Sequence, residues 1–214
     1  MAEDERLREA LLELQLLRTR EAQSLDETRK LVECLEAYSS AATPGAALSS
    51  IFISLRNTIG ADVSLLGQID KTGAFTVLAS DARALTGQCL VPPFDLSARS
   101  RNIADLTMLG PWDGEFDASR YSALQAVPVM ADGAPHAVLV FKVDKPPFEK
   151  NSLRLVERLA GLAMRAWQGS KIAGENKLLA AAIHGSSSGF AMADATSDER
   201  PLIYSNRILG PVGA

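Results

Sequence analysis

The N-terminal stretch, residues 3–40, contains neither glycine nor proline. Most of its residues are good helix formers, so the stretch predicts one continuous helix. At about 1.5 Å per residue, such a helix is on the order of 55 Å long. A single helix of that length cannot bury an apolar stripe by itself. Another part of the fold, or a second chain, therefore has to cover it.

Apolar residues recur along this helix on alternating four- and three-residue steps, which is the a and d pattern of a coiled coil. The seam consists of Leu7, Leu11, Leu14, Leu25, Val32 and Leu35, and it is interrupted by Arg18, Glu21 and Thr28. Polar residues in a seam lower its stability but can fix its register. We expect a homodimer through this coiled coil. The alternative is a surface helix that packs on its own domain.

A segment rich in turn residues, 39–45, separates the helix from a body that extends to about Gln168. Helical spacing of apolar residues over 47–59 predicts a helix, and Gly60 follows it as a C-terminal glycine. Strands are predicted at 62–69, 74–80, 123–130 and 137–143. The turn sequences DKTG and ADGAP join them in pairs. A closing helix begins near Asn151 or Ser152, so the body is α+β with antiparallel strands.

The four–three alternation continues through the closing helix. It predicts further dimer contacts at Leu155, Leu159, Leu162 and Ala166. Farther along, the same positions hold small or polar residues, and Gly169 and Gly174 each cost up to about 1 kcal/mol of helix propensity. The segment fits either a signalling helix whose register shifts cheaply or a poor linker that frays.

Composition excludes several classes of protein. A net charge of −4 and a pI near 5.3 argue against general nucleic-acid binding. The two cysteines, Cys34 and Cys89, are too few for a disulfide framework and suit a reducing compartment. No apolar run is long enough for a membrane span, and the acidic N-terminus is not a signal peptide. We expect a cytoplasmic protein.

The last part of the sequence begins a domain without finishing it. Residues 190–193 and 202–204 predict two short strands, and only eight residues follow Asn206. Two strands without partners cannot bury a core. We therefore expect this chain to be a piece of a larger protein.

The body resembles a GAF domain, a small sensory module of bacterial signalling proteins. The resemblance covers about 43–168 and rests on the text of 47–70, on NIADL, and on 122–141, which reads small-apolar-Pro, turn with Gly, apolar strand. It implies an antiparallel sheet with flanking helices, here extended by long N- and C-terminal coiled-coil helices. The expected domains are 1–42 for the coiled coil, 43–168 for the GAF-like body and 169–185 for a linker helix.

Residues 182–206 resemble the start of a PAS domain of the flavin-binding LOV type, and 186–214 are the expected bounds of this incomplete domain. The matching positions are Phe190, Asp194, Ala195, Pro201, Leu202, Ile203, Tyr204 and Asn206. The photoreactive cysteine segment of that family lies farther along than this chain extends. The resemblance therefore carries no flavin site to this chain.

Together the resemblances imply a sensory and dimerisation module that is not an enzyme. It would relay a conformational change through its helices to a PAS/LOV-type domain and to a downstream output domain, as in a sensor histidine kinase or a cyclic-dinucleotide enzyme. No cofactor is expected. The alternative is a cofactor-binding photosensor or a small-molecule-binding GAF enzyme.

Residues for chemistry are scarce. His136 is expected in an exposed hairpin, and His184 lacks the sequence of a phosphoacceptor box. Asp194 is better explained as a turn residue than as a catalytic carboxylate. Phosphate-loop, nucleophile-elbow and zinc-protease motifs are absent from the sequence. Cys89 precedes Leu90 rather than the histidine that often follows a bilin-attachment cysteine, and the body lacks the several cysteines of methionine sulfoxide reductases in this family.

What remains is a pocket for a small ligand between a sheet face and the mid-chain loops. Its candidate residues are Cys89, Phe94, Asp105, Trp112, Phe116 and Tyr121. They are mostly apolar with a few polar tips, as ligand pockets tend to be. The alternative is that the aromatic residues fill a core beneath long loops. Asp105 is expected to bond the backbone of its own turn or to cap a following helix.

Overall fold

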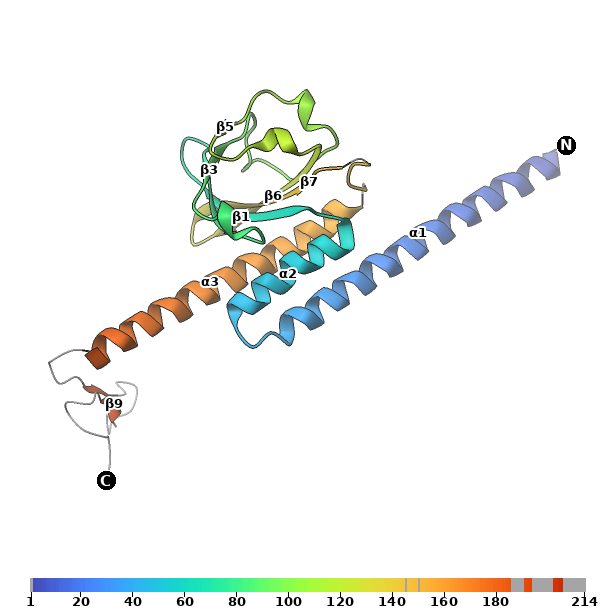
Figure 1. Cartoon of the computed structure of the whole chain (residues 1–214). Coiled ribbons are helices and arrows are strands. Elements are labelled where there is room, and N and C mark those ends of the chain that lie inside the picture. Colours follow the sequence, from blue (N-terminus) through green and yellow to red (C-terminus); the bar gives the residue numbers. More distant parts are fainter. Residues whose placement is uncertain (1, 145, 150, 186–190, 194–201, 206–214) are drawn as a thin grey trace. The chain divides into compact units, whose positions relative to one another are not determined.

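The computed structural model describes residues 2–144, 146–149, 151–185, 191–193 and 202–205. It divides into two units, Met1–Trp167 and Gln168–Ala214. The first unit opens with helices α1 (Ala2–Ser39) and α2 (Pro44–Ile59), which pack against each other. Figure 1 shows them as an antiparallel hairpin of helices. The long N-terminal helix predicted from the sequence is therefore confirmed.

Helix α2 begins earlier than apolar spacing alone predicted, because its cap precedes that pattern. Thr43 accepts a bond from the Ala46 N–H, and Pro44 takes the first helical position, where a missing N–H costs nothing. Gly60 ends the helix in the left-handed conformation, with φ 66°, as expected.

The body contains a seven-stranded antiparallel sheet in the order β4-β6-β7-β1-β2-β3-β5. The four long strands confirm the four predicted ones within a few residues. They are β1 (Val63–Ile69), β2 (Phe75–Ser80), β6 (Ala123–Ala131) and β7 (Ala134–Lys142). Asp132 and Gly133 turn β6 into β7 with positive φ at both residues, as a tight hairpin requires.

The mid-chain segment, expected to be mostly loop, adds three short strands and three 3₁₀ turns. The strands are β3 (Cys89–Val91), β4 (Arg101–Ile103) and β5 (Asp113–Gly114). The turns are η1 (Arg83–Leu85), η2 (Leu106–Met108) and η3 (Ala118–Arg120). The short strands complete the two edges of the sheet.

Each face of the sheet buries its own core. Helices α2 and α3 (Ser152–Gly185) cover one face, and the mid-chain loops cover the other (Figure 1). Adjacent strand residues point to opposite faces, so Leu66 lies in the helix-side core and Leu65 in the loop-side core. The sheet therefore separates a helical layer from a loop layer.

Helix α1 uses one face to pack on its own body. Cys34 is buried, and Leu31 and Tyr38 pack against the same helix-side core. The predicted coiled-coil seam lies on another side of the helix and is exposed, including Leu14 at 52% and Leu25 at 67%. Leu11, Val32 and Leu35 are exposed as well. The side chain of Leu7 lies outside the described part.

Helix α3 corrects part of the expected dimer surface. Leu155, Leu159 and Ala166 are buried against the sheet of their own chain, and Leu162 is half-buried against the same core. Side chains already buried in this way cannot offer a surface to a second chain. Their four–three spacing reflects a helix face that packs on a sheet.

The second unit contains the end of α3 and a strand pair. The strands β8 (Ala191–Ala193) and β9 (Leu202–Ser205) are antiparallel partners, which confirms two strands at the predicted places. Phe190, Asp194, Ala195, Pro201 and Asn206 lie outside the described residues, as does the side chain of His184. In the described part, every helix is too short or too polar to cross a bilayer.

Candidate functional site

The loop layer of the first unit encloses a cleft of about 510 Å³, which is within the size range of small-molecule sites. We call it the loop cleft. Its lining comes from the chain between Leu106 and Tyr121, so η2, β5 and η3 all contribute. The lining residues are Leu106, Thr107, Leu109, Gly110, Pro111, Trp112, Gly114, Glu115, Phe116, Asp117, Ala118, Ser119 and Tyr121.

An aromatic cluster forms the inner wall of this cleft. Phe116 and Tyr121 stack with ring centroids 5.5 Å apart, and both lie 5.0 Å from the fully buried ring of Phe141 on β7. Trp112 meets Phe141 at 6.0 Å and Phe94 at 5.9 Å in edge-on contacts. These spacings are those of favourable aromatic pairs. The aromatic residues predicted for the pocket therefore also fill the loop-side core.

Polar atoms inside the loop layer lack partners. The indole N–H of Trp112 is buried and makes no hydrogen bond among the described residues, and the same holds for the Arg101 Nε. The guanidinium of Arg101 stacks over Phe94 at 5.0 Å. A buried donor without an acceptor costs about 1–3 kcal/mol.

Short local motifs fix the loops around the cleft. At Asp105, one carboxylate oxygen accepts the N–H of Thr107 at 3.0 Å and its hydroxyl at 2.6 Å, which confirms the expected cap of a following helix. Asp117 holds Ser119 in the same way at the start of η3. Asp70 and Asp95 repeat the motif in neighbouring loops. All four follow the sequence Asp-x-Ser/Thr.

These bonds also set the acidity of two of the carboxyls. Bonds from the hydroxyl and backbone N–H of Thr72 lower the pKa of Asp70. Bonds from Ser97 lower the pKa of Asp95 in the same way. At the cleft itself, burial raises the pKa of the Tyr121 hydroxyl, which keeps it protonated and able to donate.

The six predicted pocket residues divide into three groups. Trp112, Phe116 and Tyr121 line the loop cleft. Phe94 packs against Trp112, and Asp105 stabilises the loop by capping η2. Cys89 lies on β3, half-buried, and is not part of the lining. The sequence did not single out Glu115 and Ser119 as lining residues, because nothing in it distinguishes them from other residues of the same loop.

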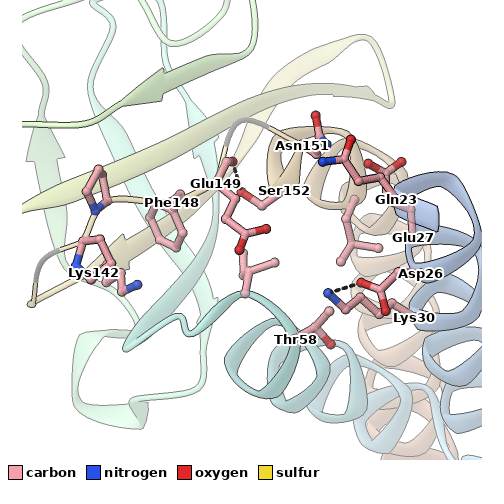
Figure 2. Close-up of a pocket in the computed structure, with 14 residues that line it drawn as sticks. Gln23, Asp26, Glu27, Lys30, Thr58, Lys142, Phe148, Glu149, Asn151 and Ser152 are labelled. Atoms are coloured by element: carbon pink, nitrogen blue, oxygen red, sulfur yellow. Dashed lines mark hydrogen bonds and ion pairs between the residues drawn. The ribbon is translucent and has the colours of Figure 1, made fainter. Parts of the chain in front are cut away.

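A second cavity, of about 280 Å³, lies between α1, α2 and the segment that joins β7 to α3. We call it the helix groove. Figure 2 shows Lys30 ion-paired to Asp26 on α1, and Glu149 across the groove. Phe148 and Leu155 contribute apolar surface. The complete lining is Gln23, Asp26, Glu27, Lys30, Thr58, Ile59, Lys142, Pro146, Pro147, Phe148, Glu149, Asn151, Ser152 and Leu155.

The charges in the helix groove are mixed. The Asp26–Lys30 pair has an O–N distance of 2.7 Å, and the hydrogen bond from Lys30 lowers the pKa of Asp26. Lys142 lies 5.8 Å from the centre of the Phe148 ring. The helix groove is therefore lined by both acidic and basic side chains, and neither sign of charge dominates. It lies where α1 approaches the start of α3.

Polar bonds link the chain that follows Tyr121 to the end of β7 and to the start of α3. Ser122 follows Tyr121 directly, and its hydroxyl is 3.3 Å from both the Lys142 and the Asp144 carbonyls. Gln125, on β6, is fully buried, and its side-chain N–H donates to the Ser152 hydroxyl at 2.6 Å. Ser152 in turn donates to the Glu149 carbonyl at 2.7 Å. Strand β6 thus begins beside the cleft wall and is hydrogen-bonded, through Gln125, to the first residue of α3.

His136 is not an exposed hairpin residue, which corrects the sequence expectation. It lies within β7, only 5% exposed, because the strand begins at Ala134 and turns this side chain toward the helical layer. Its ring lies 6.2 Å from that of Trp167 on α3, and its Nδ1 is 3.0 Å from the Ala134 carbonyl. Within the described ranges, no three His, Cys, Asp or Glu side chains gather around a common point for a metal ion.

No model of a protein family matches this chain, and no curated protein sequence matches it either. Its fold, by contrast, matches solved structures at low sequence identity. The GAF domain from a phosphoenolpyruvate-protein phosphotransferase of Coxiella burnetii is 14% identical with a TM-score of 0.50, and the match covers 72% of this chain and 98% of that one.

Two further structures have the same fold. The free methionine-R-sulfoxide reductase from Neisseria meningitidis, solved with its substrate, is 13% identical with a TM-score of 0.52, and the match covers 69% of this chain and 91% of that one. The photosensory core module of a Stigmatella aurantiaca phytochrome is 15% identical with a TM-score of 0.51, and the match covers 75% of this chain but 40% of that module. The chain therefore has a GAF-like α+β fold, in which an antiparallel sheet separates flanking helices from a loop layer.

Proposed function

We propose that this chain is the sensory and dimerisation module of a larger signal-transduction protein, such as a sensor histidine kinase or a cyclic-dinucleotide enzyme. The observation that carries the proposal is the two-sided use of α1. One side packs on the body through Cys34, whereas the coiled-coil seam stays exposed with Leu14 and Leu25 more than half accessible. An exposed apolar seam of this length calls for a second helix.

The relay in this proposal follows the polar links of β6. A ligand or contact that moves Tyr121 also moves Ser122, which is bonded to the segment before α3. Gln125 ties the same strand to Ser152 at the start of that helix. A displacement at the cleft wall is thus passed to the first turn of α3. In the proposed full-length protein, α3 leads to a PAS/LOV-type domain.

Light scattering with seam variants tests dimerisation. The variant Leu11→Lys/Leu14→Lys places four like charges in the seam of a dimer and should halve the measured mass. Leu12→Lys/Leu16→Lys is the matched control, since these leucines are 66% and 53% exposed but lie off the seam. The control should keep the mass of the unmodified protein. An unchanged mass in the seam variant would contradict dimerisation through this seam.

A second function, small-molecule binding in the loop cleft, is favoured by the unpartnered Trp112 N–H. A ligand with a hydrogen-bond acceptor and a flat apolar part would satisfy both that donor and the aromatic wall. Native mass spectrometry and an absorption spectrum of the purified protein test this candidate. Added mass that disappears in Trp112→Phe would support it, whereas a bound chromophore or turnover would favour the photosensor or enzyme alternative.

A further inference from the structure

We propose that the helix groove binds a small organic cation, an ammonium or guanidinium group on a short aliphatic stem, which ties α1 to the segment before α3. This site lies on the helical side of the sheet, whereas the loop cleft lies on the other side. The groove volume of about 280 Å³ is roughly nine times the ~30 Å³ that a water molecule occupies in the liquid. A linear diamine or an alkylguanidine is of that size.

The charges of the groove are unevenly matched. Among the described lining residues, three carboxylates accompany two ammonium groups. Asp26 and Lys30 neutralise each other at 2.7 Å. Glu27 of α1 and Glu149 of the segment before α3 make no ion pair with another described residue. Figure 2 shows Lys142, the second ammonium group, on the side of the groove away from α1.

The two carboxylates without ion pairs lie on opposite walls of the groove. Carboxylates that face each other repel, and a cation between them removes the repulsion. An ammonium group carries three donors and a guanidinium five, so either can be shared between two carboxylates. Because Glu27 belongs to α1 and Glu149 precedes α3, the shared cation would link these two elements.

The apolar part of the lining favours an organic cation over a metal ion. Ile59, Phe148 and Leu155 contribute hydrocarbon surface, and the last two are each only 5% exposed. Calcium and magnesium ions take about six or more oxygen ligands, which these side chains do not supply. An aliphatic stem gains free energy by lying against them. The Phe148 ring already has a cation near it, since the Lys142 Nζ lies 5.8 Å from the ring centre.

Buried hydrogen bonds fix one wall of the groove. Ser152 lines the groove, and its hydroxyl accepts from the fully buried Gln125 and donates to the Glu149 carbonyl. These bonds hold the backbone at Glu149 in place before a ligand binds. A wall that is already ordered lowers the free-energy cost of binding.

An NMR titration of this chain tests binding. Putrescine, a linear aliphatic diamine, and agmatine, an alkylguanidine, should bind, whereas uncharged butanediol should not. Glu27→Gln and Glu149→Gln should each raise the Kd for putrescine about tenfold, because each removes a charge-assisted contact. Glu13→Gln is the matched control, since Glu13 is an exposed carboxylate of α1 outside the groove, and it should leave the Kd unchanged.

Several results of this titration would overturn the inference. One is no binding of either cation at concentrations up to about 10 mM. Another is an equal Kd in Glu27→Gln and Glu13→Gln. Tighter binding of magnesium or calcium ions than of putrescine would show a metal site instead. Tighter binding of a blocked lysine peptide would assign the groove to a basic side chain of a partner protein.

Labelling of Cys34 tests the link between the two elements. This thiol is buried on the body-facing side of α1, so a reagent reaches it only when the helix lifts away. In a Cys89→Ser background, putrescine at about ten times its Kd should slow labelling about tenfold. The reason is that a ligand of the docked state alone lowers the undocked population by the factor 1 + [L]/Kd. Binding without slower labelling would contradict the link.

The variant Glu149→Lys tests the same link without a ligand. It places an ammonium group on an aliphatic stem opposite Glu27. Cys34 should therefore be labelled more slowly than in the Cys89→Ser background alone, and putrescine should no longer bind. Glu149→Gln should be labelled at an intermediate rate. A Glu149→Lys protein that is labelled as fast as its background would overturn the link.

The proposed site lies within one chain, since every lining residue comes from it. The seam variant Leu11→Lys/Leu14→Lys should therefore bind putrescine with an unchanged Kd, whether or not its mass is halved. A failure of the proposed dimerisation thus leaves this prediction standing. A seam variant that loses putrescine binding would move the site to a contact between chains and overturn the inference.

Discussion

At the scale of single residues, two glycines differ in the space available for a side chain. A Cβ on Gly67 of β1 would lie 2.4 Å from both the Phe75 ring and the Thr76 carbonyl oxygen. Gly161 of α3 has nothing within 4 Å of such an atom. The close approach at Gly67 lies next to a register shift between β1 and β2.

Substituting both glycines by alanine should therefore give opposite effects. Gly67→Ala should lower the free energy of unfolding by about 1–3 kcal/mol through overpacking. Gly161→Ala should raise it by roughly 0.5–1 kcal/mol, since alanine is the better helix former. Chemical denaturation at equal protein concentration measures both. A stabilised Gly67→Ala protein would contradict the close approach.

The carboxyl of Asp70 predicts an acid response. Its pKa is lowered in the folded protein by the bonds from Thr72, so ionised Asp70 contributes stability above its unfolded pKa of about 3.9. That contribution is lost as pH falls through the lowered folded pKa. An NMR titration should find a midpoint for Asp70 below the ordinary value, and Asp70→Asn should remove this part of the acid destabilisation while keeping the turn acceptor. A midpoint at or above the ordinary value would contradict the turn geometry.

At the scale of elements, the start of α3 depends on a buried polar contact. The side-chain amide N–H of Gln125 donates to the Ser152 hydroxyl at 2.6 Å. The side-chain amide oxygen of Gln125 is buried without a partner among the described residues. A double-mutant cycle of Gln125→Ala and Ser152→Ala should give a coupling energy of about 0.5–1.5 kcal/mol. Exposed Ser49→Ala on α2, combined with Gln125→Ala, should show coupling near zero. Zero coupling between Gln125 and Ser152 would remove this contact from the relay.

The longer elements could be predicted from the sequence, because their signals extend over several residues. Helical spacing of apolar residues repeats along α2, and β6 and β7 are nine-residue, mainly apolar runs joined by a turn sequence. Strand β5 has only two residues, so no period can appear in it. Its position depends on pairing with β3, which is a tertiary contact.

The candidate site could be predicted only in part, for a related reason. Periodicity identifies the apolar side of a helix but not what covers it, so Leu155 and Leu159 looked like a seam and form a core. Likewise, aromatic residues in a long loop indicated a pocket, and Trp112, Phe116 and Tyr121 do line one. That the Trp112 N–H lacks a partner depends on the surrounding loops and has no sequence signal.

At the scale of the whole molecule, Cys34 reports whether α1 is docked on the body. Cys34 lies on the body-facing side of α1 and is 3% exposed, so labelling of its thiol requires the helix to lift away. In a Cys89→Ser background, Tyr38→Ala should increase the labelling rate about tenfold or more, because a loss of 1.4 kcal/mol corresponds to a tenfold change in population. The seam variant Leu14→Lys should leave the rate within about threefold. Equal acceleration by both variants would show that the two faces of α1 are not independent.

The short edge strands of the sheet affect whether two neighbouring bodies can aggregate through their sheet edges. The terminal strands β4 and β5 contain three and two residues, and each is followed by irregular chain. The proposed dimer would hold two such sheets at high local concentration, where long exposed edges would invite strand-to-strand aggregation. Edges this short offer few free N–H and C=O groups to a neighbour. Tethering at an effective concentration of about millimolar should therefore leave the two bodies of the proposed dimer as separate particles.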